Sequence, residues 1–195
     1  PGCPFLKRSG WPGSFRDAIS QEGRYITFSV SGTIDLTNGG LAYLKSNTTV
    51  DASTAPDGGI TFVGPSIVAY NGVHDIILAG FRHRGGWRPD VGERNSAGTC
   101  IQIYQNNYNI VLDHLSLSGF DDEAVTVWEN NHDITIQNCF FGPGAWPGHK
   151  FTLLVGEKSY RVTLYRNLFA GTPEQRNPAI GWDDAGGTIS DGIVG

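Results

Sequence analysis

The sequence predicts an all-β chain that winds into a parallel β-solenoid. Short apolar runs of strand-like residues recur at a regular spacing, polar or glycine-containing turns separate them, and no long helical periodicity lies between them. An alternating α/β sheet would need amphipathic helices of about 10–15 residues between its strands. The chain has 195 residues, of which 39% are hydrophobic and 17% charged. This is enough to bury a sizeable core, so we expect a single domain over residues 1–195.

The apolar runs form two families with the same spacing. The first family has steps of 34, 24 and 28 residues and begins at Ile76, Ile110, Ile134 and Val162. The second family has steps of 24 and 28 residues and begins at Ile101, Val125 and Leu153. Equal steps indicate two faces of one repeating coil, and the long step of 34 predicts an inserted loop around residues 84–98.

The turns between the runs repeat as well. Asn-containing turns at residues 107–109 and 131–133 precede two members of the first family. Asn tolerates the left-handed conformation that a tight corner requires, so these turns are interpreted as structural. Near the start of the chain, residues 14–19 predict a short amphipathic helix with Ser14 as its N-cap, placed to cover the open end of the solenoid.

Composition excludes several classes of protein. The net charge of −5 argues against nucleic-acid binding, and no apolar run approaches the roughly 20 residues of a membrane helix. No signal peptide is recognisable, and the chain opens on Pro1 without Met, which predicts a processed or trimmed chain. Cys100 and Cys139 lie in apolar runs and are expected to be buried free thiols.

Several segments resemble the calcium-dependent pectate lyase family. The segments at residues 13–19, 28–34 and 47–56 are similar to the opening of these enzymes. The order Asp113-His114, Ser116, Asp122-Glu123 resembles a central stretch of the family, and Arg176-Asn177-Pro178 resembles its "RNP" motif. The resemblance runs from about Gly13 to Ile180.

This resemblance implies a right-handed parallel β-helix of the pectin-lyase-like kind, secretion, and β-elimination of polygalacturonate. It also implies calcium held by carboxylates. Arg176 matches the catalytic arginine, and Lys150 is the best match to the substrate-binding lysine. Asp122 matches a calcium-binding carboxylate, with Glu123 beside it.

The sequence also departs from the family pattern. Residues 97–99 are Ala-Gly-Thr where relatives have two acidic calcium ligands, and Thr126 replaces a further carboxylate. The second arginine after the "RNP" motif is absent, because Ala179 follows Pro178. Relatives also continue for several coils beyond Gly195, so one interpretation is a truncated C-terminus. These departures put calcium binding in question.

The coil spacing selects the same residues without the resemblance. Lys150 follows Asp122 by 28 residues and Arg176 follows Lys150 by 26, close to one coil each. We therefore expect Asp122, Lys150 and Arg176 at one corner on three successive coils, about 4.8 Å apart per coil. A carboxylate, an ammonium and a guanidinium in one column form a plausible uronate-binding site, although each also has an interpretation as an ordinary loop or structural residue.

Four further residues are candidates for substrate binding. Arg84 lies in a cluster of arginines, and Arg166 stands where relatives have a histidine. Trp128 has the ring needed to stack on a sugar, and His149 adjoins Lys150. For three of them a structural alternative is open: a solvated loop for Arg84, a coil cap for Trp128 and a surface side chain for His149.

Two functions from different classes fit these observations. The first is a pectate lyase-like enzyme that cleaves polygalacturonate or pectin by β-elimination, with calcium as cofactor. The second is a non-catalytic β-solenoid that binds glycans or serves as a structural spike, as the missing carboxylates would favour. A hydrolase is a weaker third option, because only Asp121-Asp122 hints at paired carboxylates.

Overall fold

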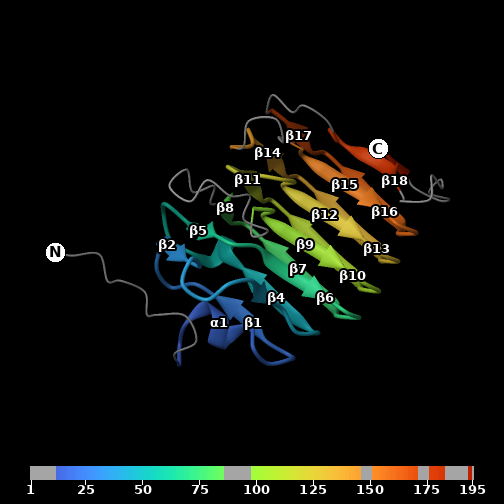
Figure 1. Ribbon diagram of the computed structural model, residues 1–195. Helices are drawn as coiled ribbons and strands as arrows, with labels where there is room; N and C mark the ends of the chain where they lie inside the picture. The colour runs from blue at the N-terminus through green and yellow to red at the C-terminus, as the bar shows by residue number, and fades with distance from the viewer. Residues whose placement is uncertain (1–11, 86–97, 146–150, 171–175, 183–192, 195) are drawn as a thin grey trace.

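The computed structural model describes residues 12–85, 98–145, 151–170, 176–182 and 193–194. Within these ranges the chain forms three parallel sheets that run the length of the molecule. Figure 1 shows the strands following one another in chain order from the N-terminal to the C-terminal end. None of the helices in the described part of the chain is long and apolar enough to cross a membrane.

The strands are assigned to the three sheets as follows. Sheet A contains β1 (Tyr25–Thr27), β4 (Thr48–Asp51), β7 (His74–Ala79), β10 (Tyr108–Asp113), β13 (His132–Gln137), β16 (Tyr160–Tyr165) and β19 (Ile193–Val194). Sheet B contains β2 (Gly32–Asp35), β5 (Ile60–Gly64), β8 (Arg82–Gly85), β11 (Ser116–Ser118), β14 (Phe140–Phe141) and β17 (Leu168–Phe169). Sheet C contains β3 (Ala42–Tyr43), β6 (Ile67–Tyr70), β9 (Ile101–Tyr104), β12 (Val125–Trp128), β15 (Leu153–Gly156) and β18 (Ala179–Trp182).

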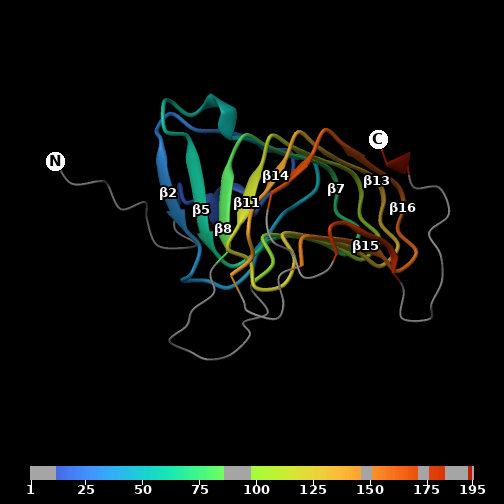
Figure 2. The ribbon, with the colours of Figure 1, turned by 90° about the horizontal axis from the view of Figure 1, so that it is seen from above.

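Each full coil contributes one strand to each sheet, as in the run β10, β11, β12. Neighbouring strands of a sheet belong to successive coils and pair in parallel. In Figure 2 the sheet B strands β2, β5, β8, β11 and β14 lie side by side in chain order. The predicted parallel β-helix is therefore confirmed.

The register agrees with the repeat found in the sequence. In sheet A, Ile110 pairs with Ile76 on one side and with Ile134 on the other. In sheet C, Val125 pairs with Ile101 and with Leu153. All six side chains are at most 1% exposed and belong to one core, because inward residues of successive coils stack directly on one another. The two families of apolar runs are thus two of the three faces of the coil.

The Asn corners are structural, as expected. Asn107 and Asn131 are completely buried, and the Asn107 Nδ2 donates to Asn131 Oδ1 at 2.8 Å. The Asn131 amide also donates to the carbonyl oxygens of Ile103 and Trp128. Side-chain amides thereby satisfy backbone groups that the turn leaves out of the sheets. This ladder keeps the corner between sheets C and A in the same place on each coil.

A short helix closes the N-terminal end. Helix α1 (Phe15–Ala18) begins after Ser14, whose hydroxyl accepts a hydrogen bond from the Asp17 N–H at 3.2 Å. The Phe15 ring lies 4.5 Å from the Phe62 ring, measured between centroids, so the helix covers the first complete layer of the core. A 3-10 turn, η1 (Ala52–Thr54), follows β4. The predicted capping helix is confirmed. Cys100 and Cys139 are buried free thiols.

Candidate active site

Arg176 and Glu123 form an ion pair in the segments that precede the strands of sheet C. Arg176 precedes β18 and Glu123 precedes β12, so the two residues are 53 positions apart and come from coils that are not adjacent. The Arg176 Nη1 donates to Glu123 Oε1. The Arg176 guanidinium also lies over the Phe151 ring of the intervening coil, 4.4 Å from its centroid. The Arg176 guanidinium is therefore held by the Glu123 carboxylate and by the Phe151 ring at the same time.

The backbone explains how these residues come together. The Phe151 N–H donates to the Asp122 carbonyl oxygen at 3.1 Å, and the Leu153 N–H donates to the Arg176 carbonyl oxygen at 2.8 Å. The segments before β12, β15 and β18 thus stack as successive layers of one corner. The stacking predicted from the sequence spacing agrees with the structure for Asp122 and Arg176, while Lys150 lies outside the described residues.

The Glu123 side chain is buried and accepts hydrogen bonds from two residues, Arg176 and Thr126. It is 3% exposed, and its second oxygen, Oε2, accepts from the Thr126 hydroxyl at 3.1 Å. Burial raises the pKa of Glu123 to about 7, with a further contribution from the charge of Asp122, while Arg176 and Thr126 act in the opposite direction. Thr126, which stands where the family pattern has a carboxylate, therefore serves to fix Glu123.

Asp121 contributes a second buried carboxylate at this corner. Asp121 is 1% exposed, and its backbone N–H donates to the Gly98 carbonyl oxygen at 3.0 Å. The Asp121 carboxylate occupies the space where a Cβ atom on residue 98 would lie. Glycine at position 98 therefore allows an acidic side chain from the next coil to enter the region where relatives have their own acidic residues.

The side-chain oxygens at this corner can be compared with the ligands that calcium requires. Calcium takes six to eight oxygen ligands at 2.3–2.6 Å. Both carboxylate oxygens of Glu123 accept hydrogen bonds from Arg176 and Thr126. Over the described ranges, no group of three or more His, Cys, Asp or Glu side chains is placed to hold a metal ion. The described residues therefore do not fit a resident calcium ion, and the structure gives Glu123 a different partner from the one that the resemblance implies.

The other predicted residues are distributed over the molecule. Trp128 is the last residue of β12, on the same face of that strand as Thr126. Arg84 is on sheet B, where its guanidinium donates to the Ser116 carbonyl and hydroxyl oxygens. Arg166 follows β16 of sheet A and lies over the Tyr165 ring. Arg84 and Arg166 thus lie on other sheets, and His149 lies outside the described residues.

Two residues of the site were not selected from the sequence. Phe151 supports Arg176, and it could have been found because it stands one position after Lys150 in the predicted column. Tyr104 pairs with Trp128 across β9 and β12, at the 24-residue step of the repeat. Burial raises the pKa of Tyr104 to about 12, and the charges of Glu123 and Asp122 add to the effect.

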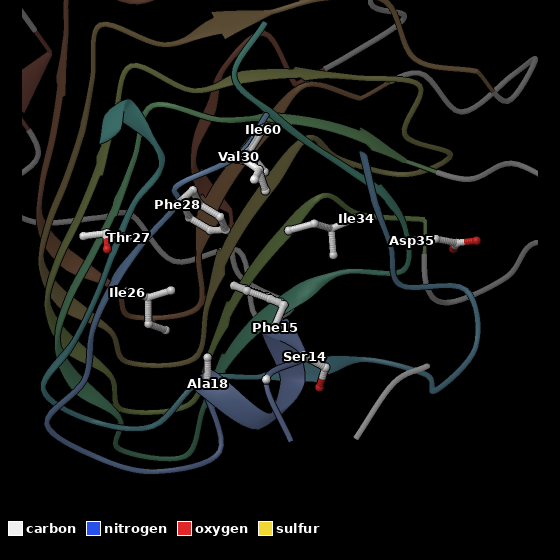
Figure 3. Close-up of a pocket in the computed structure, with 11 residues that line it drawn as sticks. Ser14, Phe15, Ala18, Ile26, Thr27, Phe28, Val30, Ile34, Asp35 and Ile60 are labelled. Carbon is white, nitrogen blue, oxygen red and sulfur yellow. The ribbon is translucent and has the colours of Figure 1, made fainter. Parts of the chain in front are cut away.

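A separate apolar pocket lies at the N-terminal end of the molecule. It has a volume of about 200 Å³ and is lined by residues of α1, β2 and β5 and of the segment around β1. Figure 3 shows Phe15, Ile26 and Ile34 around it. The lining is mostly aliphatic and aromatic and includes no Arg, Lys or His, so this pocket has none of the groups that a uronate would need.

Comparison with known proteins bears on the family. The chain is 29% identical to a probable pectate lyase C of Aspergillus flavus over 94% of its own length. It is 30% identical to a probable pectate lyase C of Aspergillus terreus over 86%, and 29% identical to a probable pectate lyase of Solanum lycopersicum over 86%. The resemblance to the pectate lyase family is confirmed. The chain spans 44%, 37% and 44% of these three relatives, which is less than half of each. No protein-family model matches the chain.

The fold comparison agrees with this resemblance to pectate lyases. The structure of "jun a 1, the major allergen from cedar pollen" superposes with a TM-score of 0.56 at 19% sequence identity. The match covers 83% of this chain and 58% of the cedar protein. At this identity the match supports the shared fold, while the pectate lyase resemblance rests on the sequence relatives.

Proposed function

We propose that this chain is the β-helix of a secreted polysaccharide lyase that cleaves polygalacturonate or pectin by β-elimination. The observation that carries the proposal is the Arg176 guanidinium, held in a fixed position by Glu123 and Phe151 at the corner that the sequence spacing selected. The similarity to probable pectate lyases over most of the chain supports the same reaction.

The reaction requires a cation at one place on the substrate. The C5–H bond beside the uronate carboxylate breaks and its proton passes to a base. The electron pair forms a C4=C5 double bond, and the C4–O4 bond breaks with its electrons passing to the oxygen of the neighbouring sugar, which takes up a proton from water. Negative charge builds on the carboxylate during this step, so a guanidinium directed at it stabilises the transition state more than the ground state. We assign this role to Arg176, with Lys150 as a second cation.

The resemblance also gives Arg176 the role of base. In the structure the Arg176 guanidinium is paired with the Glu123 carboxylate. Abstraction of the proton by Arg176 therefore requires the guanidinium to leave Glu123 when substrate binds. Because a guanidinium paired with a carboxylate keeps its proton, we propose that the uronate carboxylate takes the place of Glu123 and that Arg176 acts as the stabilising cation rather than as the base.

Calcium remains a proposal that the described residues do not support by themselves. When bound, the ion would neutralise uronate carboxylates. Besides Glu123, the corner holds the carboxylates of Asp121 and Asp122. The four oxygens of these two carboxylates fall short of the six to eight required. We therefore expect activity to survive chelation, whereas its loss in chelator and recovery with added calcium would contradict this expectation.

The deciding experiment measures ultraviolet absorbance of polygalacturonate and of methylated pectin incubated with the protein. The expected result is a rise from the unsaturated uronate product, which Arg176→Ala abolishes. Arg161→Ala is the matched control, because Arg161 is an exposed arginine on sheet A. A new reducing end without an absorbance rise would indicate a hydrolase instead. Binding without any product would favour a non-catalytic glycan-binding solenoid.

A further inference from the structure

A single histidine interrupts an apolar column in the core beneath sheet B. Figure 2 shows β5, β8 and β11 next to one another, and paired positions on the six strands of sheet B face the core. These positions hold Ile34, Phe62, His83, Leu117, Phe141 and Phe169. Five of the six side chains are hydrocarbon, and the sixth, His83, is 0% exposed. The His83 imidazole therefore occupies a place that the repeat otherwise gives to apolar side chains.

The hydrogen bonds of His83 fit only the neutral imidazole. Its Nε2 lies 3.2 Å from the Pro65 carbonyl oxygen, which can only accept, so Nε2 is the nitrogen that carries the proton. Its Nδ1 is buried and has no hydrogen-bond partner. Protonation would place a second N–H at Nδ1, where none of the described residues accepts it. A buried donor without an acceptor and a buried charge without a counter-ion both destabilise the folded state.

His83 differs in this respect from the other histidines in the described part of the chain. Those three each lie beside a carboxylate, in the pairs His74–Asp75, His114–Asp113 and His132–Asp133. Within the described ranges no hydrogen bond or ion pair joins His83 to a carboxylate. The buried carboxylates of Asp121 and Glu123 belong to the segment before β12, where Glu123 is paired with Arg176. A positive charge on the other three rings is balanced by a neighbour, whereas a positive charge on His83 is not.

The groups nearest to His83 also disfavour its protonated form. The paired positions on β5 and β11 present only apolar side chains to the ring. On its own strand the neighbours Arg82 and Arg84 are cations, and Arg84 Nη1 donates to the His83 carbonyl oxygen at 3.2 Å. The Cys100 thiol donates to the same carbonyl oxygen at 3.9 Å. Burial raises the pKa of Cys100 to about 12, so this thiol does not become a counter-anion. A protonated His83 would be a cation near other cations in a low-dielectric core.

We propose that His83 is an acid-sensitive switch in the solenoid: protonation of its buried ring separates β8 from β5 and β11 and opens the stack of coils. The coil that contains β11 also carries Glu123 and β12, so the stack opens directly before the candidate active site. The inference does not depend on the lyase reaction. It sets a lower pH limit for the folded chain whatever ligand the chain binds.

The direction of the pH dependence follows from proton linkage. Burial lowers the pKa of His83 from 6.5 to about 4 in the folded chain, and the Arg84 charge acts in the same direction. The unfolded chain therefore takes up this proton near pH 6.5 and the folded chain only near pH 4. The contribution of His83 to stability is complete above pH 6.5 and falls as the pH is lowered towards 4. One linked proton raises the unfolding equilibrium constant about tenfold per pH unit in this window.

The test compares urea unfolding of the wild-type chain and of His83→Gln at several pH values between about 7.5 and about 4.5. Glutamine can donate a hydrogen bond but takes up no proton in this range. Between about pH 6.5 and about pH 4.5 the unfolding constant of the wild type, divided by that of the variant, should rise about 100-fold. The ratio is used because Glu123, whose raised pKa acts in the opposite direction, is common to both proteins. A ratio that does not change with pH would overturn the proposal.

The matched control is His114→Gln, because the His114 side chain is 68% exposed. This variant should keep the pH dependence of the wild type, and an equal flattening in both variants would show that the effect is not specific to the buried ring.

Two measurements on the wild type keep the proposal testable if His83→Gln does not fold. Nuclear magnetic resonance of labelled histidine should show a neutral His83 ring in the folded protein from about pH 7 to about pH 5. Titration of that ring near pH 6.5 without unfolding would overturn the proposal. Hydrogen exchange at about pH 5 should show the amides of β5, β8 and β11 losing protection before those of β13 and β16. The opposite order would place the opening elsewhere and contradict the assignment to His83.

Discussion

Sheets A and C are built by the same coils and the same repeat, yet their outer faces differ. On sheet A several outward side chains are polar and paired with one another, as in the contacts of Arg161 with Asp133 and of Asn109 with Asp75. On sheet C the outward side chains of Val68, Thr126 and Leu154 are at most 6% exposed. Sheet A therefore presents solvated polar pairs, whereas part of the outer face of sheet C is buried and the Arg176–Glu123 ion pair lies at its edge.

The largest expected difference between the two sheets is in the reaction rate after one arginine is removed from each. Arg176→Ala should reduce the rate of product formation by about 10²–10³-fold, because a group that stabilises developing charge in a desolvated site contributes on that scale. Arg161→Ala should leave the rate unchanged. The absorbance assay on polygalacturonate measures both. Similar losses for the two variants would show that the sheets do not differ in function.

A carboxylate introduced on the outer face should lower the free energy of unfolding much more on sheet C than on sheet A. Leu154→Asp puts a carboxylate at a position that is 6% exposed, and it should lower the free energy of unfolding by about 2–4 kcal/mol. Thr163→Asp introduces the same group at an exposed position of β16 and should change it by less than about 0.5 kcal/mol. Urea unfolding followed by circular dichroism compares the two. An equal loss of unfolding free energy in the two variants would show that the outer faces of sheets A and C do not differ in burial.

Glu123→Gln tests whether the carboxylate positions Arg176. The amide keeps the size and can still accept from Arg176, but it removes the charge, so we expect kcat to fall by about 10–100-fold with little change in KM. The full pH–rate profile should be recorded for both proteins. A higher kcat, with its rising limb moved to lower pH, would show that Glu123 restrains Arg176 as a base rather than holding it in position.

The smallest expected effect concerns the ion pair of sheet A. Hydrogen bonds from Arg161 and His132 hold the pKa of Asp133 well below its usual range. A carboxyl group with a lowered pKa stabilises the folded state above its ordinary pKa, and this contribution is lost as pH falls through the lower value. Because the pair is exposed, Asp133→Asn should reduce stability only slightly near neutral pH, and added salt should reduce the difference further. Thermal unfolding at two salt concentrations checks this. A large effect that is independent of salt would make the pair structural.

The repeat explains why so much of the fold could be predicted. Inward residues of a coil must be apolar at every turn, and the same step returns at each corner, so the register of Ile76, Ile110 and Ile134 is visible in the sequence alone. The cap at Ser14 follows from local hydrogen bonding in the same way. The corner at Asp122 and Arg176 could be predicted for the same reason, since one step of the repeat advances the chain by one coil.

Side-chain partners across coils are a different kind of information. The resemblance to the pectate lyase family placed Glu123 beside Asp122, which matches a calcium-binding carboxylate of that family. The structure directs the Glu123 side chain toward Arg176 and Thr126, and no local pattern encodes a contact between residues 53 positions apart. The sequence by itself determined the coil, its register and its corners, because these repeat locally. Only the tertiary structure decided which charges meet and which face is covered, because those depend on side chains brought together from separate coils.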